Sequence, residues 1–482
     1  MKHPPRLLIS AAHKSSGKTT ISIGLCKSLR DRGVDVQPFK KGPDYIDPMW
    51  LSAAAGRTCR NLDFNVMERS EIAAYFGRHA AGADFALIEG NKGLYDGLDL
   101  DGSNSNAALA ALLGAPVMLV VDARGMTRGI APLILGFQAF DRSIDIAGVI
   151  LNNLGGARHE AKLRAVIEHY TDVPVVGAVH HDARIEIVER HLGLMPSNES
   201  TEAAARISEI GAAIARQVDL DRVLEISGWL PSVRRRASAT ETAAVKPGQV
   251  ADVRIGWARD RAFGFYYADD LEALQKAGAR LVPVDTLHDS RLPLLDGLFI
   301  GGGFPERLMQ ELEANAALRA DIRRAALGGL PVYAECGGLM YLARSISWNG
   351  VTRQMAGVIP ADVVMHDKPA GRGYVRLRET DGHPWPQLAS GGGELPAHEF
   401  HYSTLENIGA GVDFGYEVLR GHGIDGRRDG IVCHNVFASY AHLRSVGAHN
   451  WAQRFVAFVR RVKSGTRQSE AAAEKRGREA IC

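Results

Sequence analysis

The sequence predicts an α/β protein of two domains, the first of them built on a doubly wound parallel sheet. Three observations predict this architecture: short apolar runs alternate with helical segments, a small polar stretch interrupts the alternation, and a second alternating block follows it. Near-continuous runs of Val, Ile, Leu and Ala are typical of parallel strands that are covered on both faces. Strands that alternate with helices predict crossover connections and therefore a doubly wound sheet.

The first half of the chain contains apolar runs that we expect to be strands, at residues 6–10, 34–39, 85–89, 116–122, 147–152 and 174–179. Segments with the apolar spacing of helices lie between these runs, among them residues 19–30 and 160–170. We expect this first domain to span residues 1–231.

Residues 232–250 are small and polar and have no apolar period, so we expect an interdomain linker there. A second block of strands is predicted at residues 253–257, 280–284, 297–301 and 331–334. From Gly357 onward strands are expected to dominate, up to a last helix at about residues 447–462. The second domain is therefore expected at residues 251–462, followed by a flexible tail at residues 463–482.

The composition excludes several classes of protein. The chain has 482 residues, of which 46% are hydrophobic, so neither disorder nor a fibrous repeat describes the whole chain. Its 57 Lys and Arg against 55 Asp and Glu give no electrostatic reason to expect nucleic acid as a partner. No apolar run reaches the roughly 18–20 residues that span a bilayer, and no signal peptide is recognisable. Five cysteines without metal-ligand spacing favour a reducing compartment, so we expect a cytoplasmic protein.

The loop AAHKSSGKTT between the first strand and the first helix predicts a phosphate site. Backbone N–H groups of such a loop converge on one point, and the helix N-terminus adds partial positive charge. Gly17 allows close approach to phosphate, Lys18 supplies a charge, and the Thr19 hydroxyl can bind Mg²⁺. Ala12 replaces the usual first glycine, and a chance Gly-Lys-Thr in a turn is the alternative. The expected ATP-binding residues are Ser15, Ser16, Gly17, Lys18, Thr19, Thr20 and Lys41.

Carboxylates follow three of the predicted strands, where the phosphate site of an α/β fold is expected. Asp44 and Asp47 follow the second predicted strand. Glu89 ends the third predicted strand and Asp96 follows it, and Asp122 ends the fourth. Carboxylates beside bound ATP hold hard cations through oxygen, while neighbouring lysines neutralise charge on a transferring phosphoryl group. Each carboxylate taken alone would more often be a solvated loop residue.

The second half contains a candidate nucleophile, Cys336, in the run PVYAECGGLMYL. A cysteine on a tight turn from strand to helix is exposed and strained, and the helix N-terminus favours its thiolate. The glycine next to it lets a backbone N–H donate a hydrogen bond to an oxyanion. The earlier run FIGGGFPE offers a second such donor. The general base is left open by spacing alone, among His398, His401, His434 and His442. Cys26, Cys59 and Cys433 are expected to be core residues, and Cys482 incidental.

Together these motifs resemble the cobyrinate (hydrogenobyrinate) a,c-diamide synthase family. The most specific are KKGPDYIDPMW, EGNKGLYDG, AFGFYY, GGGFPE, AECGGLMYL and HEFHYS, so the resemblance covers nearly the whole chain. It implies a dethiobiotin-synthetase-like P-loop domain followed by a flavodoxin-like class I glutamine amidotransferase domain. It also implies ATP and Mg²⁺ as cofactors, with L-glutamine and a tetrapyrrole polycarboxylate as substrates. A carboxylate would be phosphorylated by ATP, and ammonia from glutamine would attack the acyl phosphate.

The resemblance also implies roles for particular residues. Cys336 would be the glutaminase nucleophile and His442 its base, with oxyanion donors at Gly302 and Gly337. Thr19, Asp44 and Glu89 would hold the metal. The residues implied in phosphoryl transfer or substrate binding are Asp44, Tyr45, Ile46, Asp47 and Asp96, of which Tyr45 and Ile46 would contact the tetrapyrrole.

The chain departs from the common pattern at several points, which keep alternatives open. Class I amidotransferases usually have Glu two residues after the base, whereas this chain has Arg444, so a Cys–His dyad is expected. Asn91 and Lys92 replace apolar residues, and residues 99–106 are unusually polar. These departures are consistent with a sirohaem-amidating relative in dissimilatory sulfur metabolism. Cobyric acid synthase is a further alternative, and a P-loop switch ATPase with an inactive second domain is one of another class. A homodimer is one option for the oligomeric state.

Overall fold

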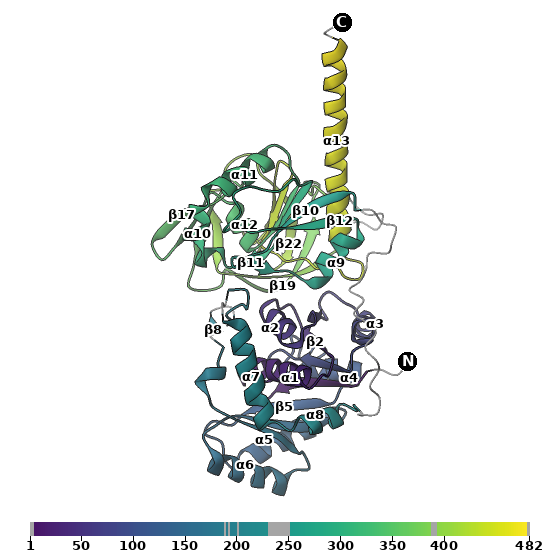
Figure 1. Cartoon of the computed structure of the whole chain (residues 1–482), viewed down its shortest axis with the longest axis vertical. Coiled ribbons are helices and arrows are strands. Elements are labelled where there is room, and N and C mark those ends of the chain that lie inside the picture. Colours follow the sequence, from purple (N-terminus) through teal and green to yellow (C-terminus); the bar gives the residue numbers. More distant parts are fainter. Residues whose placement is uncertain are drawn as a thin grey trace. The chain divides into compact units, whose positions relative to one another are not determined.

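The structure is a computed structural model that describes residues 4–187, 189–190, 193–199, 202–229, 251–386 and 393–479. The chain divides into two compact units, Met1–Thr242 and Ala243–Cys482 (Figure 1). The predicted linker at residues 232–250 lies outside the described residues, so its bounds stay a prediction. Each unit is built around its own sheet.

The first unit contains a seven-stranded sheet in which every paired strand is parallel. Its order is β3-β2-β4-β1-β5-β6-β7. The strands are β1 (Arg6–Ala11), β2 (Val36–Lys41), β3 (Arg60–Leu62), β4 (Phe85–Glu89), β5 (Val117–Asp122), β6 (Ile146–Leu154) and β7 (Val175–His180). The six predicted strands are confirmed. The short edge strand β3, with the sequence RNL, was not predicted because it has no apolar run.

Helices cover both faces of this sheet, as a doubly wound fold requires. In Figure 1, α1 and α7 lie on one side of the sheet and α5 and α6 on the other. The helices of this unit are α1 (Lys18–Asp31), α2 (Ile46–Ala55), α3 (Arg69–Ala80), α4 (Asn106–Leu113), α5 (Ile130–Phe140), α6 (Ala157–Tyr170), α7 (Ala203–Gln217) and α8 (Leu220–Ile226). A 3₁₀ turn, η1 (Ala183–Ile185), and a two-stranded ribbon of β8 (Glu189–Arg190) and β9 (Gly193–Leu194) precede α7.

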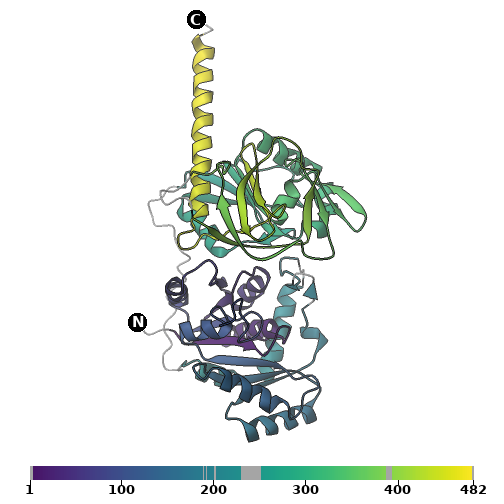
Figure 2. The ribbon, with the colours of Figure 1, turned by 180° about the vertical axis from the view of Figure 1, so that it is seen from behind.

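The second unit contains a nine-stranded mixed sheet, which Figure 2 shows from behind. In spatial order its strands are β12 (Ala279–Val284), β10 (Val253–Ala258), β13 (Gly297–Ile300), β15 (Val332–Glu335), β24 (Val436–Ser439), β23 (Arg428–Cys433), β22 (Asp413–Arg420), β19 (Gly371–Glu379) and β20 (Leu395–His401). Along this order, neighbouring strands from β12 to β24 pair in parallel. Neighbouring strands from β24 to β20 pair antiparallel. The predicted second block and the later strands are confirmed.

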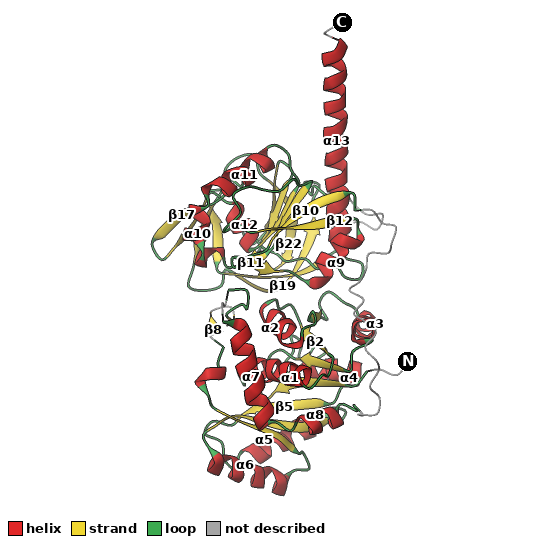
Figure 3. Cartoon of the chain, viewed as in Figure 1, coloured by secondary structure: helices red, strands yellow, loops and turns green. Residues whose placement is uncertain are grey.

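Smaller elements surround this sheet, and Figure 3 separates its helices from its strands. The remaining strands are β11 (Phe263–Phe265), β14 (Gly302–Gly303), β16 (Ser345–Trp348), β17 (Val351–Gln354), β18 (Asp362–Met365) and β21 (Ser403–Glu406). The helices are α9 (Ala268–Lys276), η3 (Pro305–Arg307), α10 (Met309–Ala314), α11 (Ala316–Leu327), α12 (Gly337–Leu342) and α13 (Trp451–Glu479). Two buried apolar clusters include residues of the central strands, so the sheet has a packed core.

The last helix differs from its prediction. We expected a helix at residues 447–462 and a flexible tail after it, but α13 begins at Trp451 and continues to Glu479. Residues 463–479 are rich in Ala, Glu, Lys and Arg, which are favourable helix formers, and this composition accounts for the longer helix.

Candidate active sites

The phosphate loop lies between β1 and α1, in the order that the sequence predicts. Helix α1 begins at Lys18, and Gly17 before it has a φ of 88°, which favours glycine. A Cβ at this position would lie 2.1 Å from Nδ2 of Asn152. That side chain, from the end of β6, donates a hydrogen bond to the carbonyl of Ser16 over 3.0 Å. Gly17 is therefore needed both for its backbone conformation and for the close approach of Asn152.

Thr19 lies in a cluster of charged side chains at the carboxyl ends of β1, β2 and β4. Its hydroxyl donates to Oε1 of Glu89 over 2.7 Å and is 3.3 Å from Oδ2 of Asp47. Nζ of Lys40 lies 2.5 Å from Oδ2 of Asp47 and 2.7 Å from Oε1 of Glu89. The fold thus brings together three predicted residues from separate elements, α1, α2 and β4. Lys40 was missed as a site residue because the sequence gives no reason to prefer it over Lys41 beside it.

Glu89 has the properties of a ligand for a cation in this cluster. Burial raises the pKa of its carboxyl, while Lys40 and the hydrogen bonds from Lys40 and Thr19 oppose that rise. Its Oε2 atom is buried and accepts no hydrogen bond from the described part of the chain. Asp44, the other predicted carboxylate ligand, lies 3.9 Å from Nζ of Lys40, and burial together with the charge of Asp47 raises its pKa to about 7. An orphaned buried carboxylate oxygen beside a Thr hydroxyl suits Mg²⁺.

The described residues hold no cluster of three or more His, Cys, Asp or Glu side chains arranged to enclose a metal ion. Mg²⁺ in nucleotide sites usually takes one or two protein oxygens and completes its shell with water and phosphate. The donor set of Thr19 and Glu89, with Asp44 nearby, is compatible with that mode of binding.

Two further lysines line this site. Burial, together with the charge of Lys40, lowers the pKa of Lys18 to about 8 against the opposing effect of nearby carboxylates. Burial is likewise the main reason that the pKa of Lys41 is lowered to about 8. Nζ of Lys41 donates to Oδ1 of Asn91 over 3.0 Å, so the end of β2 is joined to the loop after β4.

Other predicted residues have structural partners that the sequence did not reveal. Oδ2 of Asp96 accepts the N–H of Gly93 over 2.9 Å and so fixes its own loop. Asp122 pairs with Arg124 over 2.5 Å and does not hydrogen-bond to the Thr19 cluster. Ile46 opens α2 and is buried, with 7% of its surface exposed. The predicted roles of Ser15, Thr20, Tyr45, Ile46 and Asp96 stay predictions.

The polar run at residues 99–106 has a local structural reason. Oδ1 of Asn104 accepts the N–H of Leu98 over 2.8 Å, and the Ser105 hydroxyl caps α4 by accepting the N–H of Ala108 over 3.0 Å. Nδ2 of Asn106 donates to the carbonyl of Gly93 over 2.8 Å. These polar side chains thus hold their own loop, and the sequence alone could not separate that role from substrate contact.

Cys336 lies on the turn between β15 and α12, with φ 47° and ψ −103°. A non-glycine residue rarely adopts a positive φ. Nucleophiles on sharp turns from strand to helix are among the residues that do. The turn is tight, because a Cβ at Gly338 would lie 2.1 Å from the carbonyl oxygen of Ile300. We expected an exposed thiol, but only 7% of Cys336 is exposed, and Sγ lies 4.0 Å from the carbonyl oxygen of Phe400. Cys26, Cys59 and Cys433 are buried as expected.

Among the candidate bases, His442 forms a hydrogen bond with the nucleophile. Burial alone would lower its pKa, but hydrogen bonds with Cys336 and Glu335 raise it to about 10. His398 stacks on His442 with ring centres 4.9 Å apart, and His401 stacks on Tyr440 instead. A histidine with a raised imidazole pKa beside a cysteine favours a thiolate–imidazolium pair.

The predicted oxyanion donors lie beside this pair. A Cβ at Gly302 would lie 2.7 Å from Cε1 of His442, and a Cβ at Gly337 would lie 2.9 Å from the backbone N of Gly303. The two glycine segments therefore approach each other and the base more closely than any side chain would allow.

The sequence comparisons agree with this pair of sites. Residues 8–194 match the family described as the CobQ/CobB/MinD/ParA nucleotide binding domain, and residues 254–449 match the CobB/CobQ-like glutamine amidotransferase domain. A cobyrinate a,c-diamide synthase of Magnetococcus marinus is 48% identical over 95% of this chain and 97% of its own length. Namesakes from Methanosarcina acetivorans and Listeria innocua are 42% and 37% identical, over 94% and 91% of this chain and 95% and 96% of their own lengths.

The chain belongs to the cobyrinate a,c-diamide synthase family. The predicted resemblance, the α/β fold class and the glutamine- and ATP-dependent ligase activity are confirmed by these matches. The match to the nucleotide-binding family also confirms ATP binding. No helix among the described residues is long and apolar enough to cross a membrane.

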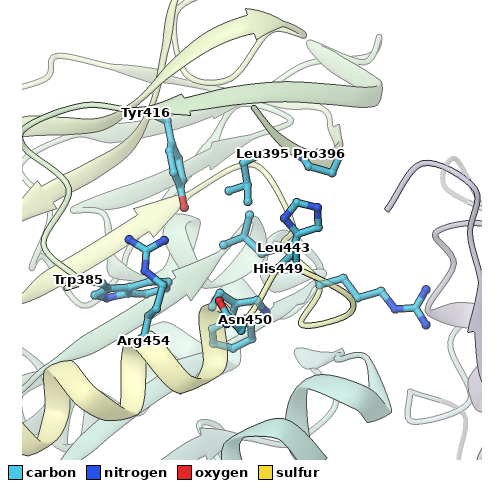
Figure 4. Close-up of a pocket in the computed structure, with 11 residues that line it drawn as sticks. Trp385, Leu395, Pro396, Tyr416, Leu443, His449, Asn450 and Arg454 are labelled. Atoms are coloured by element: carbon cyan, nitrogen blue, oxygen red, sulfur yellow. The ribbon is translucent and has the colours of Figure 1, made fainter. Parts of the chain in front are cut away.

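A pocket of the second unit lies outside this diamide synthase site. Its cavity has a volume of about 60 Å³. Figure 4 shows Leu443, His449 and Arg454 among the residues that line it. Neither Cys336 nor His442 lines it. Pockets that enclose small ligands commonly measure roughly 300–1,000 Å³, so we do not assign this cavity to glutamine.

Proposed function

We propose that this protein uses ATP and glutamine to amidate the a and c acetate side chains of cobyrinate or hydrogenobyrinate. The observation that carries the proposal is 48% identity over 95% of the chain to a protein named cobyrinate a,c-diamide synthase. The charged cluster around Thr19 and the Cys336–His442 pair give each half of that reaction its own chemistry.

The first unit would activate the carboxylate. A carboxylate is a poor electrophile until one of its oxygens becomes a leaving group, so the γ-phosphoryl group of ATP is transferred to it and ADP departs. The N-terminus of α1, Lys18 and Lys41 bind the phosphates, and Thr19 and Glu89 hold Mg²⁺, with Asp44 nearby. Mg²⁺ supplies neutralising charge beside the phosphate oxygens when bound.

The second unit would release ammonia from glutamine. The Cys336 thiolate attacks the side-chain amide carbon, and the oxygen of the resulting intermediate accepts backbone N–H groups of Gly302 and Gly337. The His442 imidazolium gives its proton to the departing ammonia, and water then hydrolyses the thioester to glutamate. The ammonia attacks the acyl phosphate, inorganic phosphate leaves, and the amide forms. Transfer inside the protein keeps ammonia unprotonated and undiluted.

Separate reactions with each candidate tetrapyrrole test the proposed substrate. The enzyme receives ATP, Mg²⁺ and glutamine with cobyrinate, hydrogenobyrinate or sirohaem in separate reactions, and mass spectrometry counts the amides gained. We expect two amides on cobyrinate or hydrogenobyrinate and none on sirohaem. Amidation of sirohaem alone would overturn the proposal in favour of the sulfur-metabolism relative.

Two variants test the proposed division of labour. Cys336→Ala is expected to abolish glutamine hydrolysis but to keep amidation with added ammonia. Lys18→Ala is expected to abolish amidation with either nitrogen source and to leave basal glutamine hydrolysis detectable. Glutamine hydrolysis unchanged by Cys336→Ala would contradict the nucleophile, whereas ATP turnover without any glutamine hydrolysis in the wild type would favour an ATPase with an inactive second domain.

A further inference from the structure

The position where class I amidotransferases commonly carry a glutamate cannot orient the base here. Arg444 occupies it, two residues after His442, and is buried. Its Nη2 and Nε atoms lie 2.7 Å and 3.1 Å from Oδ2 of Asp269 on α9. A guanidinium has no hydrogen-bond acceptor to offer an imidazole N–H.

A different carboxylate faces the imidazole, and it comes from a residue that precedes His442 in the sequence. Oε2 of Glu335, the last residue of β15, lies 3.3 Å from Nδ1 of His442. Its other oxygen, Oε1, accepts the N–H of Leu443 over 3.0 Å and the hydroxyl of Tyr333 over 2.6 Å. Glu335 is 2% exposed, so these donors hold the carboxylate in one place, away from water. The hydrogen bond to Leu443 also fixes the backbone next to His442.

The ring of His442 is held from a second side. His398 on β20 stacks on it with an interplanar angle of 14°, and the two residues exchange backbone hydrogen bonds of 2.8 Å and 3.3 Å. With Nδ1 facing Glu335, the other ring nitrogen, Nε2, remains for Cys336. The imidazole is therefore oriented by elements that converge from β15 and β20.

We propose that Glu335 is the positioning residue of the glutaminase site, so that the centre is a Cys336–His442–Glu335 triad whose carboxylate comes from the residue immediately before the nucleophile. This inference rests on the nucleophilic role proposed above for Cys336. Glu335 accepts a hydrogen bond from the Nδ1–H group, selects the tautomer that directs Nε2 at the thiol, and stabilises the imidazolium. Glu335 keeps its charge throughout, and the proton that reaches ammonia comes from Nε2.

The same arrangement predicts a pH signature. The groups near His442 are Glu335 and Cys336 from β15 and its turn, His398 from β20, and the Arg444–Asp269 pair. His398 stays neutral, because burial and the charges of His442 and Arg444 hold its pKa well below the usual value. A negative Glu335 favours protonated His442, so removing that charge lowers the pKa of the imidazolium. The alkaline limb of the pH profile of glutamine hydrolysis then moves to lower pH.

Glu335→Gln tests the proposal in the full-length enzyme. We expect kcat for glutamine hydrolysis to fall roughly a hundredfold, within the range that a positioned acid–base group contributes, with KM almost unchanged. The alkaline limb moves to lower pH, and Glu335→Asp, which restores the charge, moves it back toward the wild-type position. Tyr333→Phe is the matched control, because it removes one donor to Glu335 and keeps the carboxylate. Its kcat is expected to fall no more than about fivefold, the size of one ordinary hydrogen bond.

The outcomes separate the inference from the function on which it rests. If Cys336→Ala still hydrolyses glutamine, the proposed nucleophile is wrong. If Cys336→Ala is inactive but Glu335→Gln keeps the wild-type kcat and alkaline limb, only the role of Glu335 is wrong. The thermal unfolding transition of the second unit reports whether each variant is folded there. If Glu335→Gln lacks that transition, Glu335→Asp carries the test instead, and an alkaline limb displaced to lower pH despite the restored charge would contradict the proposal.

Discussion

Buried charge determines the properties of the nucleotide site at the scale of single residues. Burial alone would lower the pKa of Lys40, but the carboxylates of Asp47 and Glu89 hold it well above its usual value. Lys40 thus remains a fixed cation inside the site. Lys18, close to that charge, is left with a lowered pKa, and ATP binding can change its protonation as it can that of Lys41.

ATP affinity should therefore depend on pH above neutrality. The pKa of Lys18 is about 8 before ATP binds, and the phosphate charge favours the protonated form, so ATP binding takes up protons above pH 8. We expect the Kd for ATP to rise between pH 7 and pH 9.5, by at most about tenfold per pH unit from this lysine. Isothermal titration calorimetry in buffers of different ionisation enthalpy measures both the Kd and the proton uptake.

Lys18→Arg is the control for this experiment, because an arginine stays charged throughout that range. Its Kd should rise less steeply with pH than that of the wild type. A wild-type Kd that is constant from pH 7 to pH 9.5 would contradict the assignment.

Gly302 gives a second prediction at this scale. An alanine Cβ would lie 2.7 Å from Cε1 of His442 and would displace the imidazole from Cys336. We expect Gly302→Ala to reduce glutamine hydrolysis at least about tenfold, since losing an oxyanion donor or the alignment of the base typically costs more than that. Amidation with added ammonia should be retained. Gly350→Ala, at an open turn of the same unit with φ 75°, controls for general backbone strain and should leave glutamine hydrolysis near the wild-type rate.

At the scale of elements, strand ends and helix starts locate both sites. Strands β2 and β4 bring Lys40 and Glu89, at their carboxyl ends, to one edge of the sheet, where Thr19 at the start of α1 also contacts Glu89. Helix α4 begins just after the loop that follows β4 and is capped by Ser105, which is 3% exposed. The cap satisfies a backbone N–H that would otherwise be unpaired at the helix start.

Ser105→Ala should lower the free energy of unfolding of the first unit by about 1 kcal/mol, the usual value of a lost N-cap. Denaturant unfolding followed by circular dichroism measures this change. Ser208→Ala is the matched control, because Ser208 lies exposed inside α7 and alanine is the better helix former there. If Ser208→Ala destabilises the protein as much as Ser105→Ala does, the cap is not the cause.

At the scale of the whole molecule, the chain consists of two compact units with separate sheets and separate buried cores. ATP binding is assigned to the first unit, and a ligand stabilises the folded state that binds it. ATP should therefore stabilise only the unit that binds it, and so shift only the unfolding of that unit.

We expect thermal unfolding in two transitions, with ATP raising the midpoint of one of them. Leu8→Ala, in the buried strand β1, should lower that same midpoint, because deleting a buried leucine side chain commonly costs about 2–5 kcal/mol. Ile322→Ala, in the core of the second unit, is the counterpart and should lower the other midpoint. Differential scanning calorimetry distinguishes these outcomes. Both substitutions shifting one shared transition would show that the units unfold together.

Much of the fold was predictable because it depends on local apolar pattern. Continuous apolar runs such as residues 85–89 predict buried parallel strands, and the structure has β4 at Phe85–Glu89. The three-residue edge strand β3 was not predictable, since Arg60 and Asn61 carry no apolar signal. The longer α13 follows from helix propensity, because the residues predicted as a flexible tail after residue 462 are rich in favourable helix formers.

The sequence by itself determined the two α/β units, the phosphate loop and the cysteine turn, because each depends on residues that are neighbours in the chain. Only the tertiary structure decided that Lys40 holds Asp47 and Glu89, that His442, which the resemblance implies as the base, lies at Cys336, and that Glu335 faces its ring. The physical reason is distance along the chain: a hydrogen bond needs atoms about 3 Å apart, and spacing in sequence does not specify which distant side chains a sheet brings together.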